Sequence, residues 1–476
     1  MIGRSDELAL LERQYGQKNS SLVVSYGRRR VGKSYLISHF VKTRPHFSFE
    51  ATEGLSAQDQ IYEFSKALSD CFGDVLPLKV RFEHWSDIFD YLSMRLKQRK
   101  GKKRFVVVFD EFQWMAQGRG GLVSILKKFW DTEWKSLNIM LILCGSVASF
   151  MVGRVLKSTA LYGRTTLELK VRPLKISESF LFFPKTRSQN EIYNYLIVFG
   201  TIPKYLEMLD HSRSFQINLE NTCFKPDGIW LDEFERVFCS QFKKASHYTR
   251  IVRALAQKKL SLEGLSVLTR VPSGGGLKRY LNHLVDADFI SEEFQVLRGS
   301  SAKNRKYYLS DPFLRFYFSF IEPNHSRIKK AGFVGLSGQI LSIGYESFRG
   351  LAFENLIKSH ALEFAQKFNF ATLVKDWGGL HRAGGAGYQF DLAFLRTDGV
   401  LVLCEIKWSR HPINKSVIVD FEQKLSRLGA LKLGSLKNIS IEKALISFNT
   451  ISASVKNSKY FDYTYELAAR RVKIWG

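Results

Sequence analysis

The feature that most constrains the fold of this 476-residue chain is a glycine-rich stretch near its start. Residues 27–34 fit the pattern G-x-x-x-x-G-K-[ST]; an apolar run at 22–25 precedes them and a helical stretch at 34–41 follows. Glycines let such a loop turn tightly, so that its N–H groups point at phosphate oxygens beside the positive end of the helix dipole. The pattern therefore predicts a strand, a phosphate-binding loop and a helix.

The loop also predicts its ligands, ATP and Mg²⁺. Lys33 is expected to reach the β and γ phosphates, and the Ser34 hydroxyl to hold Mg²⁺. The loop residues expected to contact the nucleotide are Gly27, Arg28, Arg29, Arg30, Val31, Gly32, Lys33, Ser34 and Tyr35.

Two carboxylates follow a second apolar, β-branched run. Residues 104–109 are typical of a central strand of a parallel sheet, and Asp110 and Glu111 come directly after them. Parallel sheets bind ligands beyond the carboxyl ends of their strands, which predicts both acids beside the phosphate loop. Asp110 is expected to hold Mg²⁺, and Glu111 to orient or deprotonate the attacking water.

A third apolar run at 139–144 leads to Ser146. Its hydroxyl is expected to contact the γ-phosphate or the lytic water, or else to cap the next helix. Further on, Arg154 and Arg164 are each candidates for stabilising transition-state charge, in their own subunit or in a neighbour. Solvated surface arginines are the alternative interpretation of both.

These motifs, with Ile2-Gly3-Arg4 and the stretches 161–164 and 202–206, occur in the order of the archaeal-type ATPase family of the AAA+ class. The chain resembles that family over residues 1–235. The resemblance implies an ATPase core with a small helical lid, with Gly3 and Arg4 on the adenine side and Pro203 in the lid near the nucleotide. An arginine acting on a neighbour would require a homo-oligomer on ATP binding.

Composition narrows the partners and the compartment. Seventy-one Lys and Arg against 45 Asp and Glu give a net charge of +26, which favours a polyanion, DNA before an anionic membrane, unless basic surfaces are general in the host. No uncharged apolar run approaches the ~20 residues of a membrane span, and no secretory signal is visible. The five cysteines form no C-x-x-C pair, which favours reduced thiols in a cytoplasm and disfavours zinc.

The middle of the chain is strongly basic. Residues 241–330 contain seventeen Lys and Arg against seven Asp and Glu, in a pattern of helices followed by two strand-like runs at 289–297 and 306–309. This order predicts a winged helix that contacts DNA, with interdomain packing as the alternative. The basic residues predicted on its recognition helix and wing are Lys278, Arg279, His283, Lys303, Arg305 and Lys306.

A second chemical signature lies in the last third. Residues 388–394 and 400–407 predict a hairpin with Asp391 on one strand and Glu405-x-Lys407 on the other. Side chains two apart in a strand face the same side, so two acids and a lysine can meet there. Carboxylates suit Mg²⁺, and Lys407 is expected to activate water or stabilise phosphorane charge.

This hairpin resembles the PD-(D/E)xK nuclease superfamily. The resemblance carries over Asp391, Glu405 and Lys407, with Asp391 and Glu405 as metal ligands, and Glu354 matches the helix acid of that motif. Gln389 departs from the acid usual two positions before Asp391, which weakens the expected metal affinity. A degenerate nuclease fold that only binds nucleic acid therefore stays open.

Together these patterns predict a multidomain α/β protein. We expect a P-loop NTPase parallel sheet at 1–170, a helical lid at 171–240, a winged helix with an aromatic hinge at 241–325, and a restriction-endonuclease-like α/β domain at 326–476. A nucleotide-switched signalling scaffold that recruits a protein is the alternative of another class, and Glu111 argues against it.

Overall fold

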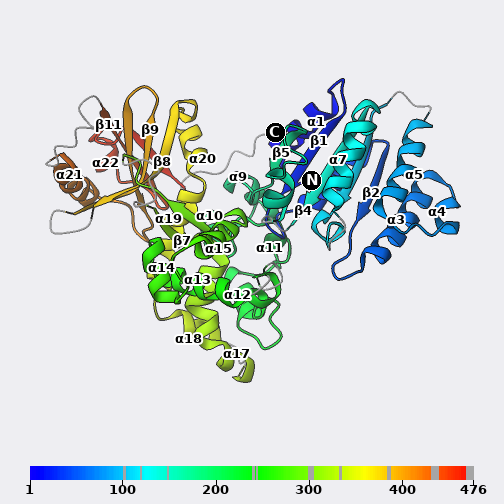
Figure 1. Ribbon diagram of the computed structural model, residues 1–476. Coiled ribbons are helices and arrows are strands. Elements are labelled where there is room, and N and C mark those ends of the chain that lie inside the picture. The colour runs from blue at the N-terminus through cyan, green and yellow to red at the C-terminus, as the bar shows by residue number, and fades with distance from the viewer. Residues whose placement is uncertain are drawn as a thin grey trace. The chain divides into compact units, whose positions relative to one another are not determined.

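The computed structural model of the chain describes residues 1–99, 103–117, 121–146, 150–238, 242, 245–297, 305–331, 335–382, 387–429 and 439–467. Figure 1 shows its elements in chain order. The chain divides into two compact units. The first comprises Met1–Leu174 with the short segments Ile202–Lys204 and Asp286–Asp288, and the second comprises the rest. The finer boundaries at 170, 240 and 325 stay predictions.

The first unit is built on a five-stranded sheet of order β2-β3-β4-β1-β5, in which all neighbouring strands are parallel. The strands are β1 (Ser21–Tyr26), β2 (His46–Glu50), β3 (Phe105–Asp110), β4 (Ile139–Gly145) and β5 (Thr165–Lys170). The three apolar runs of the sequence are thus confirmed as β1, β3 and β4. Only β4 separates β1 from β3, so the loop after β1 and the acids after β3 end at one edge, about 10 Å apart by strand spacing.

Helices cover both faces of this sheet. They are α1 (Ser5–Tyr15), α2 (Lys33–Val41), α3 (Ala57–Phe72), α4 (Leu76–Lys79), α5 (Trp85–Lys97), α6 (Phe112–Met115) and α7 (Leu122–Thr132), with a 3₁₀ turn at Trp134–Ser136 and a π-helical turn at Met151–Leu156. An aromatic core lies between β3 and α5, where the Phe89 ring stacks on Phe109 at 5.7 Å and contacts Trp134 at 5.2 Å. The indole of Trp134 donates to Ser93 Oγ at 2.7 Å. This packing fixes the strand that ends at Asp110.

The second unit begins with a helical region. Its helices are α9 (Ile176–Ser179), α10 (Gln189–Phe199), α12 (Phe215–Cys223) and a π-helical turn at Phe234–Phe238; α11 (Pro203–Glu207) begins in the first unit. The aromatic segment of α16 (Pro312–Phe316) packs against α10, with Phe313 beside Phe199 at 6.2 Å. The aromatics of this segment are buried, as the core interpretation predicts.

Three helices and a hairpin form the basic middle segment. They are α13 (Ala245–Gln257), α14 (Leu262–Thr269), α15 (Gly275–Asp286), β6 (Ile290–Glu293) and β7 (Lys306–Leu309), with β6 and β7 antiparallel. The strand predicted at 289–297 is shorter than expected, because beyond Glu293 the chain leaves β7 and Gln295 bridges to Gly379 instead.

The C-terminal region is a second five-stranded sheet, of order β12-β11-β10-β9-β8. Its strands are β8 (Val374–Arg382), β9 (Tyr388–Arg396), β10 (Val400–Lys407), β11 (Ser440–Ser447) and β12 (Tyr463–Glu466). β9 and β10 are antiparallel, as the predicted hairpin requires, whereas β10, β11 and β12 run parallel. The helices in and before this region are α17 (His325–Ala331), α18 (Leu336–Leu341), α19 (Tyr345–Ser359), α20 (Ala361–Lys367), α21 (Ser416–Gly429) and α22 (Ala453–Lys456).

Across the ranges described above, no helix has both the length and the apolar character that a membrane crossing requires.

Candidate functional site

The turn after β1 has the backbone that its two glycines permit. Gly27 adopts φ 152°, and a Cβ there would lie 2.3 Å from the Val171 carbonyl oxygen. Gly32 adopts φ 87° and stands just before α2. A side chain at Gly27 would therefore collide with the neighbouring backbone, so the loop requires glycine there.

Lys33 turns back into this loop. Its Nζ donates to the Arg28 carbonyl at 2.7 Å, and only 5% of the side chain is exposed. Burial lowers the pKa of the Lys33 ammonium, while the nearby groups Cys144, Glu111 and Asp110 oppose that change. The ammonium thus lies at the loop, close to the acids that follow β3.

The N-terminal and lid residues of the prediction reach the same loop. Arg4 is buried and donates to the Val31 carbonyl at 2.6 Å, and its preceding Gly3 adopts φ 65°. Pro203 begins α11, and the amide of the next residue, Lys204, donates to the Arg30 carbonyl at 3.4 Å. These contacts bring Gly3, Arg4 and Pro203 to the phosphate loop.

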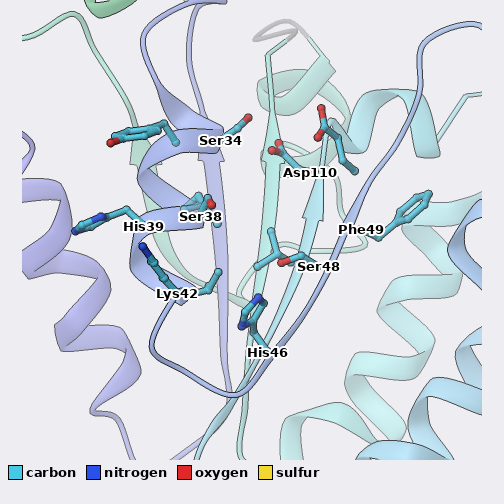
Figure 2. Close-up of a pocket in the computed structure, with 13 residues that line it drawn as sticks. Ser34, Ser38, His39, Lys42, His46, Ser48, Phe49 and Asp110 are labelled. Atoms are coloured by element: carbon cyan, nitrogen blue, oxygen red, sulfur yellow. The ribbon is translucent and has the colours of Figure 1, made fainter. Parts of the chain in front are cut away.

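A groove of about 640 Å³ lies between α2 and the strands β2 and β3. Ser34 and Asp110 both line it, and Figure 2 shows their oxygen atoms at the same end, across a gap from each other. Serine and aspartate oxygens are hard ligands of the kind Mg²⁺ takes. The donor set at this end of the groove therefore fits a magnesium ion, while the other end is lined by His39, Lys42 and His46.

Glu111 is held by neutral partners. Ser146 Oγ donates to Glu111 Oε2 at 2.8 Å, and the amide of Gln113 donates to the same oxygen and to Ser146 Oγ. Glu111 itself has φ 49°, a strained value for a residue with a side chain. Strain of this kind often marks a functional group whose direction matters. Sequence reasoning identified Ser146 but missed Gln113, which no motif marks.

Asp110 and its surroundings are partly withdrawn from water. Its carboxylate accepts the Glu111 amide at 2.8 Å, and its carbonyl accepts the Ala51 amide from beyond β2. Burial, with the charge of Asp110 next, raises the pKa of the Cys144 thiol well above its ordinary value. The Cys144 side chain is fully buried and packs in the apolar core beneath the site.

Of the two candidate arginines, Arg164 lies apart from this edge. Arg164 precedes β5, whose Thr165 pairs with Leu22 at the start of β1, while the phosphate loop follows the end of β1. A strand of this length spans about 20 Å, so Arg164 lies at the opposite edge of the sheet. Its guanidinium binds both oxygens of Asp131, at 2.7 and 2.8 Å. Action on a nucleotide in its own subunit is therefore inconsistent with the fold. Arg154 is exposed on the π-helical turn.

A second cluster lies in the C-terminal sheet. Asp391 on β9 and Glu405 on β10 are both buried, and Ile406 donates its amide to Asp391 Oδ2 at 2.9 Å. Lys407 Nζ lies 2.7 Å from Glu405 Oε1, which confirms that Glu405 and Lys407 face the same side. The structure thus brings together the acid, acid and lysine that the hairpin predicted.

The electrostatics of this cluster show how closely its acids approach. Burial raises the pKa of Asp391 to about 6, and the charges of Glu405 and Glu354 add to the effect. Glu354 on α19 pairs with Lys358 one helical turn later. Burial lowers the pKa of Lys407, but the charge and hydrogen bond of Glu405 outweigh it and leave that pKa raised.

The donor set fits magnesium in chemistry, since two buried carboxylates are hard oxygen ligands. No group of three or more His, Cys, Asp or Glu is arranged to hold a metal ion among the residues that the structure describes. Mg²⁺ needs no such group, because it keeps several waters and binds one or two carboxylates plus substrate phosphates. Gln389, the departure from the nuclease pattern, is exposed on β9.

The basic residues of the middle segment divide into two groups. Lys278 and Arg279 are exposed on α15, next to Gly275 and Gly276, around which space is open. His283 differs from the prediction: it is half-buried, its Nδ1 lies 2.6 Å from the Tyr248 hydroxyl, and burial lowers its pKa.

The predicted wing is only partly described. Lys303 lies outside the described residues. Arg305 pairs with Glu292 at 2.8 Å, and Lys306 is exposed, with Nζ 3.4 Å from His381 Nε2.

Comparison with known proteins agrees with the geometry of the first unit. Residues 1–209 match the model of a family described as an ATPase domain predominantly from Archaea. The match to an archaeal-type ATPase domain thus covers residues 1–209. A solved Walker-type ATPase of Pyrococcus abyssi is similar with a TM-score of 0.51 and 21% identity, over 67% of this chain and 96% of that one. At that identity the likeness shows the P-loop fold alone.

Two relatives come from Methanocaldococcus jannaschii. An uncharacterized protein is 28% identical over 418 residues, which is 86% of this chain and 87% of that protein. An uncharacterized ATP-binding protein is 42% identical over 43 residues, which is 9% of this chain and 73% of that protein. The first relative extends across both units, so the similarity does not end with the ATPase domain.

Proposed function

We propose that this chain is an AAA+ ATPase that uses ATP turnover to load or regulate a C-terminal, Mg²⁺-dependent DNA nuclease. The observation that carries the proposal is the meeting of Asp391, Glu405 and Lys407 in the second unit of a chain whose first unit is an ATPase domain. The strand order of the first sheet, with β4 between the loop strand and the acid strand, supports the AAA+ assignment.

In the ATPase half, the roles follow from position. Lys33 supplies positive charge to the phosphates, and Ser34 with Asp110 holds the magnesium ion, which neutralises charge on the transferring phosphoryl group. Glu111 orients the attacking water and accepts its proton. Ser146 and Gln113 keep the Glu111 carboxylate in one direction through the hydrogen bonds they donate to it.

Around the nucleotide, Gly3 and Arg4 face the adenine side, and Pro203 lies in the lid near the nucleotide. Because Arg164 lies at the far edge of its own sheet, its place in the proposal is to act on a neighbouring copy, and Arg154 is the other candidate. Gel filtration with and without ATP tests this, since an arginine that acts across subunits requires ATP-dependent assembly.

In the nuclease half, Asp391 and Glu405 hold Mg²⁺, Glu354 adds a third carboxylate from α19, and Lys407 contacts the scissile phosphate or its water. Magnesium supplies Lewis acidity to the phosphodiester. Lys278 and Arg279 on α15, with Lys306 on the hairpin, contact the DNA backbone. The segment then binds DNA as a winged helix does, through its recognition helix and its wing. The net charge of +26 supports a polyanionic partner.

A binding-only role is the second candidate, because Glu405 is already neutralised by lysines at 2.7 Å. The experiment that separates the two is cleavage of supercoiled plasmid DNA in Mg²⁺ by the full chain, by Glu405→Ala and by Lys33→Ala. We expect Glu405→Ala to abolish cleavage while DNA binding is retained. We expect Lys33→Ala to abolish phosphate release from ATP and the ATP dependence of cleavage.

Equal cleavage by the wild type and Glu405→Ala would exclude the nuclease assignment. Absence of cleavage in both, with DNA binding intact, would favour the binding-only role. ATP hydrolysis that is slow and unaffected by Glu111→Gln would favour a nucleotide-switched scaffold.

A further inference from the structure

Glu405 has a partner that the sequence motif does not contain. Lys424 Nζ lies 2.7 Å from both Glu405 oxygens, whereas Lys407 Nζ contacts only Oε1. Glu405 is 2% exposed and Lys424 is 23% exposed. Both oxygens of the central carboxylate are thus bonded to one ammonium group.

Lys424 is held there by the packing of its helix. Phe421, one turn earlier on α21, is fully buried, and its ring meets Phe390 of β9 at 5.2 Å. Val417 and Leu428 of the same helix are buried in the same core. Since residues three and four apart share a helix face, Lys424 stands over the sheet beside Phe421.

This placement matters because two ammonium groups already lie against Glu405, at 2.7 Å. A divalent cation bound to Glu405 would stand close to both positive charges, and the like-charge repulsion would weaken its binding. Asp391, the neighbouring acid, offers an oxygen besides the one that accepts the Ile406 amide. Because Lys424 contacts both Glu405 oxygens, release of its ammonium would remove the larger part of this repulsion for a metal bound between the two carboxylates.

We infer that Lys424 is the counter-ion that a divalent cation displaces from Glu405, and that the displaced ammonium then contacts the DNA phosphate. The inference rests on the proposed nuclease site and names a residue and a binding order within it. Lys407 differs, because it makes one contact from its own strand and is 38% exposed. Lys424 is accordingly the lysine that competes with the metal for Glu405.

The test is a calorimetric titration of the full chain with Mn²⁺, without nucleotide or DNA, on the wild type, Lys424→Met and Glu405→Ala. A charge-assisted hydrogen bond contributes enough that its removal should tighten Mn²⁺ binding by about ten- to a hundredfold in Lys424→Met. Lys456→Met is the matched control, since Lys456 makes a 2.7 Å contact with Glu466 at the β12 edge of the same sheet.

The outcomes separate the inference from the proposed function. Mn²⁺ affinities that depend on Glu405 but agree within about twofold between the wild type and Lys424→Met would overturn the inference and leave the nuclease proposal standing. Absence of Glu405-dependent binding in every variant would overturn both. Plasmid cleavage completes the test: Lys424→Met should bind Mn²⁺ more tightly yet cleave more slowly, and unchanged cleavage would overturn the phosphate contact. If a thermal melt shows that Lys424→Met is unfolded, Lys424→Gln replaces it.

Discussion

The two candidate sites use the same residue types in opposite ways. At the phosphate loop, Lys33 bonds the Arg28 carbonyl, and Glu111 is held by the neutral Ser146 and Gln113. In the C-terminal sheet, Glu405 is held by two lysines. Lys33 and Glu111 at the first site thus contact uncharged groups, whereas Glu405 at the second site is paired with charged ones.

The difference follows from backbone geometry. The turn at Gly27 and Gly32 curls the chain so that Lys33 finds a carbonyl of its own loop. In β10 no such turn exists, and the two-residue period places Lys407 on the same face as Glu405. A lysine next to a buried acid offsets its charge, so a cation at the second site would compete with Lys407 and Lys424 for Glu405.

The largest test of this comparison is Glu111→Gln. We expect ATP hydrolysis to fall by about 10² to 10⁴, as for loss of a general base, while nucleotide binding is retained. Phosphate release and nucleotide titration measure the two effects. Glu63→Gln is the control, because Glu63 is exposed and pairs with Lys66 in the same helix α3. Similar rates of ATP hydrolysis in the wild type and Glu111→Gln would contradict the role of Glu111 as the base that Ser146 and Gln113 hold in place.

The second test measures how folding stability depends on pH through the buried carboxyl of Asp391. Its folded-state pKa of about 6 lies above its ordinary value of 3.8, mainly because of burial. Between pH 3.8 and 6 the folded carboxyl keeps a proton that the unfolded carboxyl has lost. The contribution of this proton to folding stability is therefore present below pH 4 and is lost as the pH rises through 6. The loss amounts to at most about 3 kcal/mol.

Asp391→Asn should remove this pH dependence. Urea unfolding of the wild type and Asp391→Asn at pH 4.5 and 7, in EDTA, measures it. We expect the wild type to lose more stability than the variant between the two values. Parallel loss in both proteins would show that Asp391 ionises as freely as an exposed acid.

The third test concerns the loop backbone. Gly27→Ala places a Cβ 2.3 Å from the Val171 oxygen at φ 152°, so we expect a loss of about 1–3 kcal/mol in stability and weaker ATP binding. Gly153→Ala is the matched control, because its φ is not positive and, among the described residues outside its own helical turn, no atom lies within 4 Å of the added Cβ. Thermal melts with and without ATP measure both variants. Equal melts would mean that the turn relaxes without cost.

The smallest expected effect is on DNA affinity. The double variant Lys278→Ala, Arg279→Ala should reduce the slope of log affinity against log salt by about 1–2, one phosphate contact being about 0.9. Arg253→Ala is the control, since Arg253 lies on α13 and pairs with Glu322. Fluorescence anisotropy at several salt concentrations gives the slopes. Equal slopes would favour a packing role for this segment.

Sequence reasoning reached the parts that depend on local pattern. The strands β1, β3 and β4 follow apolar runs, and the placement of Ser34 near Asp110 follows from the rule that parallel strands end at one edge. It failed where a contact joins distant segments. His283 looked available on a helical wheel, but Tyr248 of α13 binds it.

Gln113 and Lys424 show the same limit. Neither residue belongs to a motif, and each reaches its acid through the placement of another helix: α6 for Gln113 and α21 for Lys424. Arg164 lies at the wrong edge for its own nucleotide because β5 pairs with β1 in parallel register. Chain order alone does not specify that pairing.

The amino-acid sequence alone therefore placed the groups that carry the predicted chemistry: a glycine-rich loop with a lysine, two acids after a buried strand, and a hairpin with two acids and a lysine. These features depend on residues only a few positions apart, and the geometry of a turn or a strand fixes which way such residues point. Only the tertiary structure decided which charges are already paired. That depends on helix packing over long separations in the chain, where buried aromatic contacts, rather than local period, set the position of each side chain.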